Sequence, residues 1–245
     1  MQKVLIFHKK NNILCFTSIK PLNFKGKFLK ENIKKLLAEL KINPKKIIFG
    51  KQIHSNKVLI VENKAVKNSQ EVDGFITNQK NVLLCVFTAD CIPVFIHNRV
   101  TGCIGLVHCG WKGIYKEIIK NAIKKLIKNY SVQPKNLNLI LGPSIKKCCY
   151  EVSKDLADKF KKKFGNARES ERSEKSKERY YIGLDEIVKH QILKFKIPKK
   201  NVRIINECTS CKKGKYFSYR RDGKRTGRML SGIIMGIVKS NMKEL

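Results

Sequence analysis

Residues 82–127, VLLCVFTADCIPVFIHNRVTGCIGLVHCGWKGIYKEIIKNAIKKLI, change from strand-like to helix-like patterning within one segment. The first part holds three short apolar runs flanked by Asn, Gly or Asp, a pattern typical of buried strands. These runs are Val82–Phe87, Val94–Ile96 and Gly102–Val107. Over Ile114–Ile127 the apolar residues recur every three or four positions, which predicts one amphipathic helix. A strand-to-helix junction is therefore expected at His108–Gly113.

Strands and helices are predicted on both sides of this segment, which favours an α+β fold. The other predicted strands are a hairpin of Val4–Phe7 with Ile13–Thr17, then Ile47–Phe49, Val58–Val61, Leu137–Leu141, Val202–Ile205 and a terminal strand or pair at Met229–Val238. The other predicted helices are Leu29–Leu40, a helix capped by Ser153 that ends at Phe164, and Leu184–Ile197. We expect the strands between residues 47 and 107 to form one mixed sheet.

The whole chain, residues 1–245, is expected to form a single domain, because it contains no internal repeat and no linker that divides it. One segment differs sharply in composition. Residues 166–179, NARESERSEKSKER, are polar or charged apart from one Ala. Such a segment cannot contribute to a core, so we predict a charged, mobile surface insertion there.

Composition excludes several classes of protein. With 245 residues, 42% of them hydrophobic, the chain can bury a core, so it is not intrinsically disordered. The net charge of +34 comes from 44 Lys and nine Arg spread along the chain, whereas specific recognition of nucleic acid relies on Arg. We therefore expect no specific nucleic-acid partner. No apolar run approaches the roughly 18 residues of a membrane helix, and no export signal is present. We therefore expect a cytoplasmic protein without membrane attachment. In the cytoplasm, its nine cysteines are expected to be reduced.

Three side chains that bind metals well stand at the ends of predicted strands: His54 in KQIHSNKV, Cys91 in FTADCIPV and His108 in GLVHCGWKG. Two imidazoles and one thiolate suit Zn²⁺, and three protein ligands with one open position are typical of catalytic zinc. Their separations of 37 and 17 residues match no short zinc signature. The residues alone therefore leave packed core side chains as the alternative.

Two further cysteine pairs occur in the second half of the chain. Cys208 and Cys211 form a CxxC, but no second pair or His pair at zinc-finger spacing accompanies it. Cys148 and Cys149 are adjacent, and adjacent side chains rarely point into the same metal sphere. We therefore expect no metal at the CxxC and a packing role for Cys148 and Cys149.

Seven strings in the chain resemble the YfiH-type family, long labelled multicopper polyphenol oxidoreductase or laccase-domain proteins. They lie between about residues 47 and 235, in the order QIHSNKV, EVDGFITN, FTADCIPVFI, GLVHCGWKG, LGPSIKKCCYEV, ECTSC and YFSYRRDGKRTGR. The resemblance implies a layered αββα sandwich with a mixed β-sheet. It also implies zinc-dependent phosphorolysis of adenosine, inosine, guanosine and methylthioadenosine to the free base and ribose 1-phosphate, with adenosine deaminase activity beside it. The family's His-Cys-His zinc ligands fall on His54, Cys91 and His108.

Other residues are candidates for supporting this chemistry. Asp73, in VDGFIT, and Asp90 are candidates for orienting a ligand histidine or handling a proton, with turn capping an equal alternative for Asp73. Lys112, just after a predicted helix start, is a candidate for attracting phosphate. In the purine deamination implied by the resemblance, zinc would activate the attacking water.

The N-terminal part departs from the family. Asn32-Ile33 stands where the family usually has Asn-Arg, so that Arg is not present to hold phosphate. Lys34 or Lys112 offers a point charge in its place, without the bidentate fork of Arg. The basic run SYRRDGKRTGR carries arginines that either close over a ligand of nucleotide size or decorate a loop. These are Arg220, Arg221 and Arg228.

Three other functions compete with zinc chemistry. Cys91 and His108 can form a nucleophile–base pair without metal, which would make a cysteine hydrolase, and the family fold resembles the deamidase domain of cytotoxic necrotizing factor. The old family label implies copper-dependent phenol oxidation, but multicopper sites need many histidines. The chain has only His8, His54, His97, His108 and His190. A nucleic-acid binder is disfavoured because no recognition helix or aromatic platform accompanies the basic residues.

Overall fold

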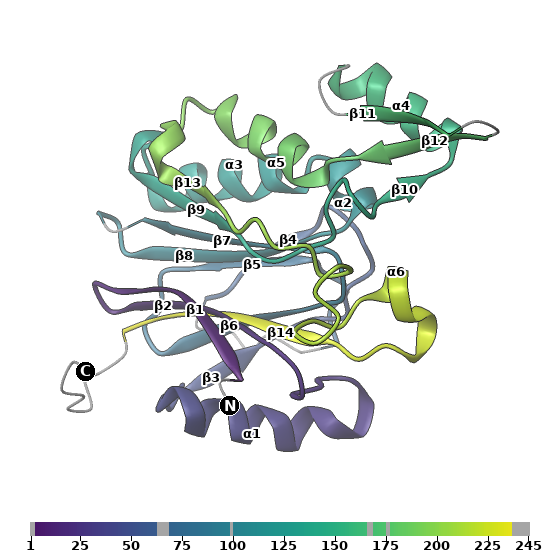
Figure 1. Ribbon diagram of the computed structural model, residues 1–245. Coiled ribbons are helices and arrows are strands. Elements are labelled where there is room, and N and C mark those ends of the chain that lie inside the picture. The colour runs from purple at the N-terminus through teal and green to yellow at the C-terminus, as the bar shows by residue number, and fades with distance from the viewer. Residues whose placement is uncertain (1–2, 63–68, 99, 166–168, 175–176, 237–245) are drawn as a thin grey trace.

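The computed structural model describes residues 3–62, 69–98, 100–165, 169–174 and 177–236. Two β-sheets lie face to face in the middle of the molecule, and helices cover both outer faces (Figure 1). The layered αββα arrangement expected for this chain is therefore confirmed, as is the single α+β domain.

The lower sheet in Figure 1 has five strands and is covered by one helix. In spatial order its strands are β1 (Val4–Lys10), β2 (Ile13–Ser18), β14 (Met229–Met235), β6 (Val82–Thr88) and β3 (Lys46–Ile48). The helix on its outer face is α1 (Leu29–Leu40). Only the β3–β6 pair is parallel, and the other neighbours in this sheet are antiparallel.

The upper sheet has six strands, and helices pack above it (Figure 1). Its strands are β13 (Val202–Ile204), β9 (Leu137–Leu141), β7 (Ile92–Asn98), β8 (Cys103–Cys109), β5 (Gly74–Thr77) and β4 (Val58–Ile60). The helices are α2 (Trp111–Tyr115), α3 (Ile118–Tyr130) and α5 (Leu184–Leu193). The remaining elements are β10 (Glu151–Val152), α4 (Lys154–Phe164), β11 (Glu169–Glu174), β12 (Lys177–Ile182), α6 (Tyr219–Asp222) and four 3₁₀ turns at Gly26–Phe28, Pro134–Asn136, Lys199–Asn201 and Gly223–Arg225.

The prediction of one mixed sheet was wrong, because the strands of residues 46–109 divide between the two sheets. The central strands are apolar at most positions because both faces of each sheet are covered. In β6, Leu84 faces the other sheet while its neighbour Leu83 faces α1. In β7, Phe95 points between the sheets while Val94 points toward the upper helices. Successive side chains therefore do point to opposite faces of each sheet. Because both faces are apolar, the sequence shows no alternation of hydrophobic and polar residues.

The amphipathic stripe predicted as one helix over Ile114–Ile127 is broken into α2 and α3. Glu117 has a φ of 57°, in the left-handed region, and turns the chain between the two helices. Both helices still bury their apolar residues against the upper sheet, since Ile114 and Ile123 belong to the same core cluster. The spacing of the apolar residues correctly predicted helical structure. That spacing gives no sign that the helix changes direction at Glu117.

The described parts of the segment 166–179 belong to two strands, which the sequence did not predict. β11 and β12 form an antiparallel hairpin that projects from the body of the molecule, with β10 pairing along β12 (Figure 1). Its polar composition gave no strand signal, because a hairpin away from the core needs backbone pairing rather than an apolar face. Residues 166–168 and 175–176 lie outside the described residues.

The other element boundaries differ little from the predictions. α5 ends at Leu193 rather than Ile197, and β14 is one strand whose predicted extension to Val238 reaches beyond the described residues. The cap on α4 is confirmed, since the Ser153 hydroxyl accepts a hydrogen bond from the Leu156 N–H. Within the described part of the chain, no helix has both the length and the apolar character needed to cross a membrane.

Candidate active site and metal centre

The functional side chains predicted from the sequence converge at one edge of the upper sheet. His108 lies near the end of β8, and the antiparallel pairing of Ile92 with Cys109 brings Cys91 alongside it. On the other side of β8, Gly74 pairs with Val107, which places Asp73 next to His108. Strand register therefore assembles residues that are 17 and 35 positions apart in the chain.

His54 reaches the same point from the loop between β3 and β4. The Gln52 side chain donates to the Phe87 carbonyl and accepts from the Phe87 N–H, so it binds this loop to β6 much as another strand would. His54 itself has a φ of 58°, in the left-handed region that few residues adopt. The strained backbone turns its side chain toward the end of β8.

His54, Cys91 and His108 form a compact group of potential metal ligands, the metal group. One potential ligand atom of each lies within 4.8 Å of the other two, and Sγ of Cys91 is 3.8 Å from Nε2 of His54. The two imidazole rings approach edge to face, with their centroids 4.9 Å apart. Two nitrogen donors and one sulfur donor at this separation fit a tetrahedral metal such as Zn²⁺ with one position left open.

Asp73 holds both histidines in place. Its fully buried carboxylate accepts hydrogen bonds from Nδ1 of His108 at 2.9 Å and from the backbone N–H of His54 at 3.0 Å. It also accepts from the Ser55 hydroxyl at 2.7 Å and from the Ser55 N–H at 2.6 Å. A carboxylate on Nδ1 leaves Nε2 of His108 as the nitrogen available to a metal. Asp73 therefore lies where it can orient the ring of His108, and it also caps the loop of His54 through the backbone N–H groups of that loop.

The charged forms of Cys91, His108 and Asp73 stabilise one another. Burial opposes ionisation of Cys91, but the positive charge of His108 and hydrogen bonds from both histidines lower its pKa to about 6. Burial likewise opposes protonation of His108, but the thiolate of Cys91 and the bond to Asp73 raise its pKa to about 9. For Asp73, hydrogen bonds from His108 and Ser55 outweigh burial and lower the pKa to about 2. Cys91 is thus a thiolate, the form that binds metals and attacks electrophiles, at neutral pH.

Gly110 is required by the close approach of its backbone to this group. A Cβ at this position would lie 2.5 Å from Cδ2 of His54 and 3.3 Å from Sγ of Cys91. A Cβ on Gly113, one turn further on, would lie 2.8 Å from the carbonyl oxygen of Ser55. The two glycines of the GWKG motif therefore let α2 pack directly against the loop that carries His54.

Asp90 does not join the metal group, although it precedes Cys91. One oxygen of its buried carboxylate accepts from the Thr209 hydroxyl at 2.6 Å. The other accepts from the Ser218 hydroxyl at 3.0 Å and from the Arg220 N–H at 2.7 Å. Asp90 thus connects the loops that carry Thr209, Ser218 and Arg220 to the site. Its hydrogen bonds in the structure go to these residues and not to a ligand histidine.

A cavity of about 710 Å³ opens beside the metal group. It is of the size that binds small molecules, and it combines aromatic side chains with three cationic ones, Lys112, Arg220 and Arg228. Its lining residues are Gly50, Gln52, Ile53, His54, Phe87, Ala89, Asp90, Cys91, His108, Trp111, Lys112, Ile145, Tyr150, Leu184, Tyr219, Arg220 and Arg228.

Two of the three arginines considered from the sequence lie at this cavity. Arg220 stacks over the ring of Tyr150, with Cζ 5.1 Å from the ring centroid. Arg221 instead bonds the carbonyls of Thr209 and Ser210 and pairs with Asp222. Composition could suggest an arginine-rich loop, but not which arginines face the cavity. The contributions of Tyr150 and Tyr219 had no sequence signal.

Ile33, which replaces the family's usual Arg, lies in α1 and packs against the core under the five-stranded sheet. Arg228 precedes β14 and lines the cavity, and its backbone N–H donates to the side-chain oxygen of Asn23. A guanidinium is therefore present at the site from a different part of the chain.

The sequence of the chain matches a known family over most of its length. Residues 25–236 match the family model described as multi-copper polyphenol oxidoreductase laccase. The chain belongs to this laccase family. Curated relatives include two proteins named purine nucleoside phosphorylase. The one from Clostridium acetobutylicum is 35% identical over 78% of either chain. The one from Bacteroides thetaiotaomicron is 30% identical over 78% of this chain and 74% of its own.

Solved structures share the fold of this laccase-family chain. The Bacillus licheniformis hypothetical protein YfiH superposes with a TM-score of 0.86 at 24% identity, covering 96% of this chain and 97% of its own. YlmD from Geobacillus stearothermophilus gives a TM-score of 0.82 at 25% identity, over 91% and 92% of the two chains. The fold of the family is thus established for this chain.

Proposed function

We propose that this chain is a zinc-dependent purine nucleoside phosphorylase. It would convert adenosine, inosine, guanosine or methylthioadenosine and phosphate to the free base and ribose 1-phosphate. The proposal depends chiefly on one observation: a His₂Cys metal group, aromatic side chains and three cations line a single cavity. The names of relatives at 30–35% identity agree with it.

The cavity supplies groups suited to both substrates. Trp111, Tyr150 and Tyr219 line it. Lys112 lies over the ring of Trp111 and Arg220 over that of Tyr150. A purine would therefore stack on Tyr219 or on the opposite faces of the other two rings. Arg220 and Arg228 present guanidinium groups, which bind phosphate oxygens in pairs, and Lys112 adds a third positive charge. These cations would hold phosphate close to C1′ of the bound nucleoside, so that the bond from C1′ to the purine nitrogen breaks as the new C1′–oxygen bond forms.

His54, Cys91 and His108 would hold the zinc ion, with Asp73 orienting the ring of His108 and bonding the backbone of His54. When bound, Zn²⁺ supplies Lewis-acid stabilisation of negative charge on a substrate or on water. The same site would give the chain adenosine deaminase activity. Copper-dependent phenol oxidation is less favoured, because the metal group brings together only two histidines and one cysteine.

Chromatography of adenosine incubated with the purified chain tests this proposal. Four mixtures are compared: with and without inorganic phosphate, each with and without prior treatment by a chelator. Adenine and ribose 1-phosphate that form only with phosphate, and are lost after chelation, would support the proposal. Inosine formed without phosphate would indicate deamination. The same four mixtures are repeated with inosine, guanosine and methylthioadenosine, and the absence of any reaction with all four nucleosides would contradict the proposal.

Arg228→Gln is expected to raise the KM for phosphate about 10- to 100-fold, because one charge-assisted hydrogen bond contributes about 1.5–3 kcal/mol. The KM for the nucleoside should change little, since the aromatic faces stay in place. Steady-state kinetics with each substrate varied in turn measure both constants. Arg225→Gln, an exposed arginine in the same loop, is the control and should leave both constants unchanged. A phosphate KM unaffected by Arg228→Gln would place the phosphate elsewhere.

A cysteine hydrolase is a second candidate, because Asp73, His108 and Cys91 stand in series. In the metal-free chain, the lowered pKa of Cys91 predicts a thiolate that iodoacetamide alkylates rapidly above pH 6. Below about pH 6 the thiol becomes protonated, so its alkylation should slow tenfold for each pH unit. Peptide mass spectrometry follows Cys91 separately from the other cysteines. Hydrolytic turnover by metal-free chain would favour this candidate over the first.

A further inference from the structure

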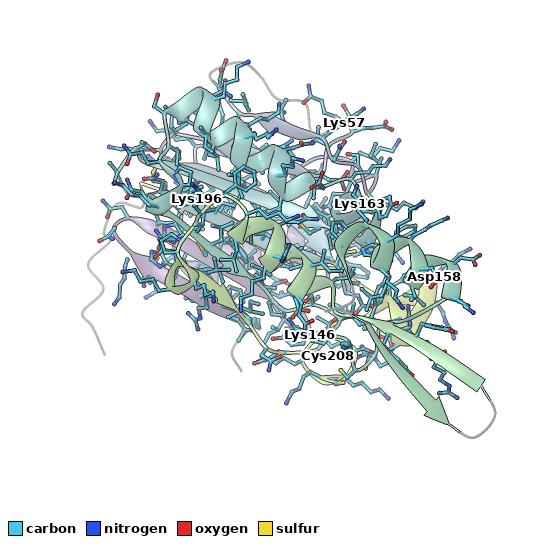
Figure 2. All side chains as sticks on the ribbon, turned by 90° about the horizontal axis from the view of Figure 1, so that it is seen from above. Lys57, Lys146, Asp158, Lys163, Lys196 and Cys208 are labelled. Atoms are coloured by element: carbon cyan, nitrogen blue, oxygen red, sulfur yellow. The ribbon has the colours of Figure 1, made fainter. Side chains whose placement is uncertain are left out.

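A second cysteine group lies outside the metal centre described above. Cys148 and Cys149 follow β9 in a turn, and Cys208 and Cys211 lie in the loop after β13. An isolated bridge between Ser144 and Cys208 joins the two loops. Figure 2 shows Cys208 beside Lys146, near the base of the projecting β11–β12 hairpin.

The four sulfur atoms form one tight cluster. Sγ of Cys211 lies 3.3 Å from that of Cys149 and 3.6 Å from that of Cys148, and the latter two are 3.8 Å apart. All four sulfurs, including that of Cys208, lie within 4.8 Å of one another. All four cysteines are free thiols in the structure, so a disulfide does not explain the cluster.

We propose that Cys148, Cys149, Cys208 and Cys211 bind one Zn²⁺ ion as a structural tetrathiolate site. Tetrahedral zinc with Zn–S bonds of about 2.3 Å separates its sulfurs by about 3.8 Å, close to the distances in this cluster. A disulfide needs sulfurs about 2 Å apart. An iron–sulfur cluster would place several iron and sulfide atoms among the thiolates and so hold them farther apart.

Local backbone geometry explains how adjacent cysteines serve one ion. The N–H groups of Cys149 and Tyr150 both donate to the Lys146 carbonyl, at 2.9 and 3.0 Å, so the chain makes a tight turn at this point. The turn brings the two neighbouring side chains onto one side. On the other loop, the Lys212 N–H donates to the Cys208 carbonyl at 3.1 Å, which turns Cys211 back toward Cys208.

The cluster has nearby cations and backbone donors. Lys147 and Lys212 adjoin Cys148 and Cys211 in the sequence, whereas Lys146 pairs with Asp185 and Glu207 precedes Cys208. Backbone groups of Cys211 and Lys146 form hydrogen bonds with the Cys208 sulfur. Hydrogen bonds of this kind stabilise metal-bound thiolates.

The ion would fasten two loops that shape the wall of the cavity. Arg220 donates to the carbonyls of Cys149 and Glu151, at 3.2 and 2.7 Å. Thr209, between the two cysteines of the CxxC, donates to Asp90. The site does not depend on nucleoside chemistry, because it contains none of the residues of the first metal group.

Metal analysis of the intact chain, purified after expression with added zinc, tests the site. We expect about two zinc ions per chain, one in each cysteine-containing group. Cys148→Ser with Cys211→Ser should lower this to about one, and so should Cys91→Ser; combining all three should leave about none. Cys148 and Cys211 are exposed, so their conversion to Ser should not disturb the core. Cys103→Ala removes a thiol far from both groups and should keep both ions.

A Co²⁺ spectrum provides a readout that distinguishes the two sites. In Cys91→Ser, the intact four-cysteine site should give intense thiolate-to-cobalt absorption. In the double variant Cys148→Ser, Cys211→Ser, the intact His₂Cys group supplies only one thiolate, so its absorption should be several-fold weaker. The proposal is overturned if the wild-type chain binds one zinc and the double substitution does not lower the count. Copper in place of zinc, or a disulfide between these cysteines in freshly purified protein, would also overturn it.

Discussion

His54→Ala is expected to lose the zinc of the His54–Cys91–His108 group and to lower nucleoside turnover by roughly three orders of magnitude. The reason is that the remaining pair of ligands holds the ion weakly, and metal stabilisation of developing charge contributes several kcal/mol, at about 1.4 kcal/mol for each factor of ten. The structural zinc proposed at the four-cysteine site should remain. Metal analysis and steady-state kinetics of the same preparation measure both effects.

The matched control is His8→Asn, a histidine on β1 outside the cavity. It should retain the metal and the turnover of the wild-type chain. A His54→Ala chain that is fully active would remove the metal group from the reaction. A chain that keeps its zinc but loses activity would instead give His54 a role other than ligation.

Gly110→Ala is expected to weaken zinc binding at the same group by about 10- to 100-fold, the range seen when the residues that orient metal ligands are changed. Its new methyl group would overlap the ring of His54 and press on Cys91. The loop must shift to relieve this overlap, at a cost in the free energy of unfolding of about 1–3 kcal/mol. Competition with a chromogenic chelator measures the zinc affinity, and thermal unfolding measures the stability.

Gly214→Ala is the corresponding control, because a Cβ at that position meets no atom within 4 Å. It should change neither zinc affinity nor stability appreciably. Unaltered zinc affinity in Gly110→Ala would mean that the position of His54 is less tightly determined by packing than the structure indicates.

The sequence was sufficient to predict most elements but not their arrangement. Apolar runs and helical periodicity located β6, β8, β9 and α1 within one or two residues. They did not separate the strands into two sheets, because strands buried on both faces are apolar at most positions and show no alternation. The αββα layering came from the resemblance to a family rather than from the pattern.

The candidate site was predictable only as a set of residues. His54, Cys91 and His108 were singled out by their chemistry at strand ends, but their proximity depends on the register of β7 and β8 and on the strained turn at His54. The bond from His108 to Asp73 likewise arises from the pairing of β5 with β8. Such long-range pairings leave no local pattern in the sequence.

The two cysteine pairs illustrate the same difficulty. Cys208 and Cys211 lack a partner pair at any familiar spacing, and the second pair lies about 60 residues earlier in an unusual adjacent arrangement. Only the approach of the two loops, joined by the Ser144–Cys208 bridge, brings all four sulfurs together. The expectation that Cys148 and Cys149 merely pack did not consider this approach.

Adenine release by metal-free chain, followed as zinc is added back in the presence of phosphate, tests most directly whether the His54–Cys91–His108 group supports nucleoside chemistry. Cys91→Ser, titrated with zinc in parallel, shows whether restored activity depends on zinc at this group or at the four-cysteine site. We predict that the metal-free chain is inactive, that activity rises with occupancy of this group, and that Cys91→Ser gains none. Full activity of the metal-free chain, or restoration of Cys91→Ser by zinc to the level of the wild-type chain, would contradict this assignment.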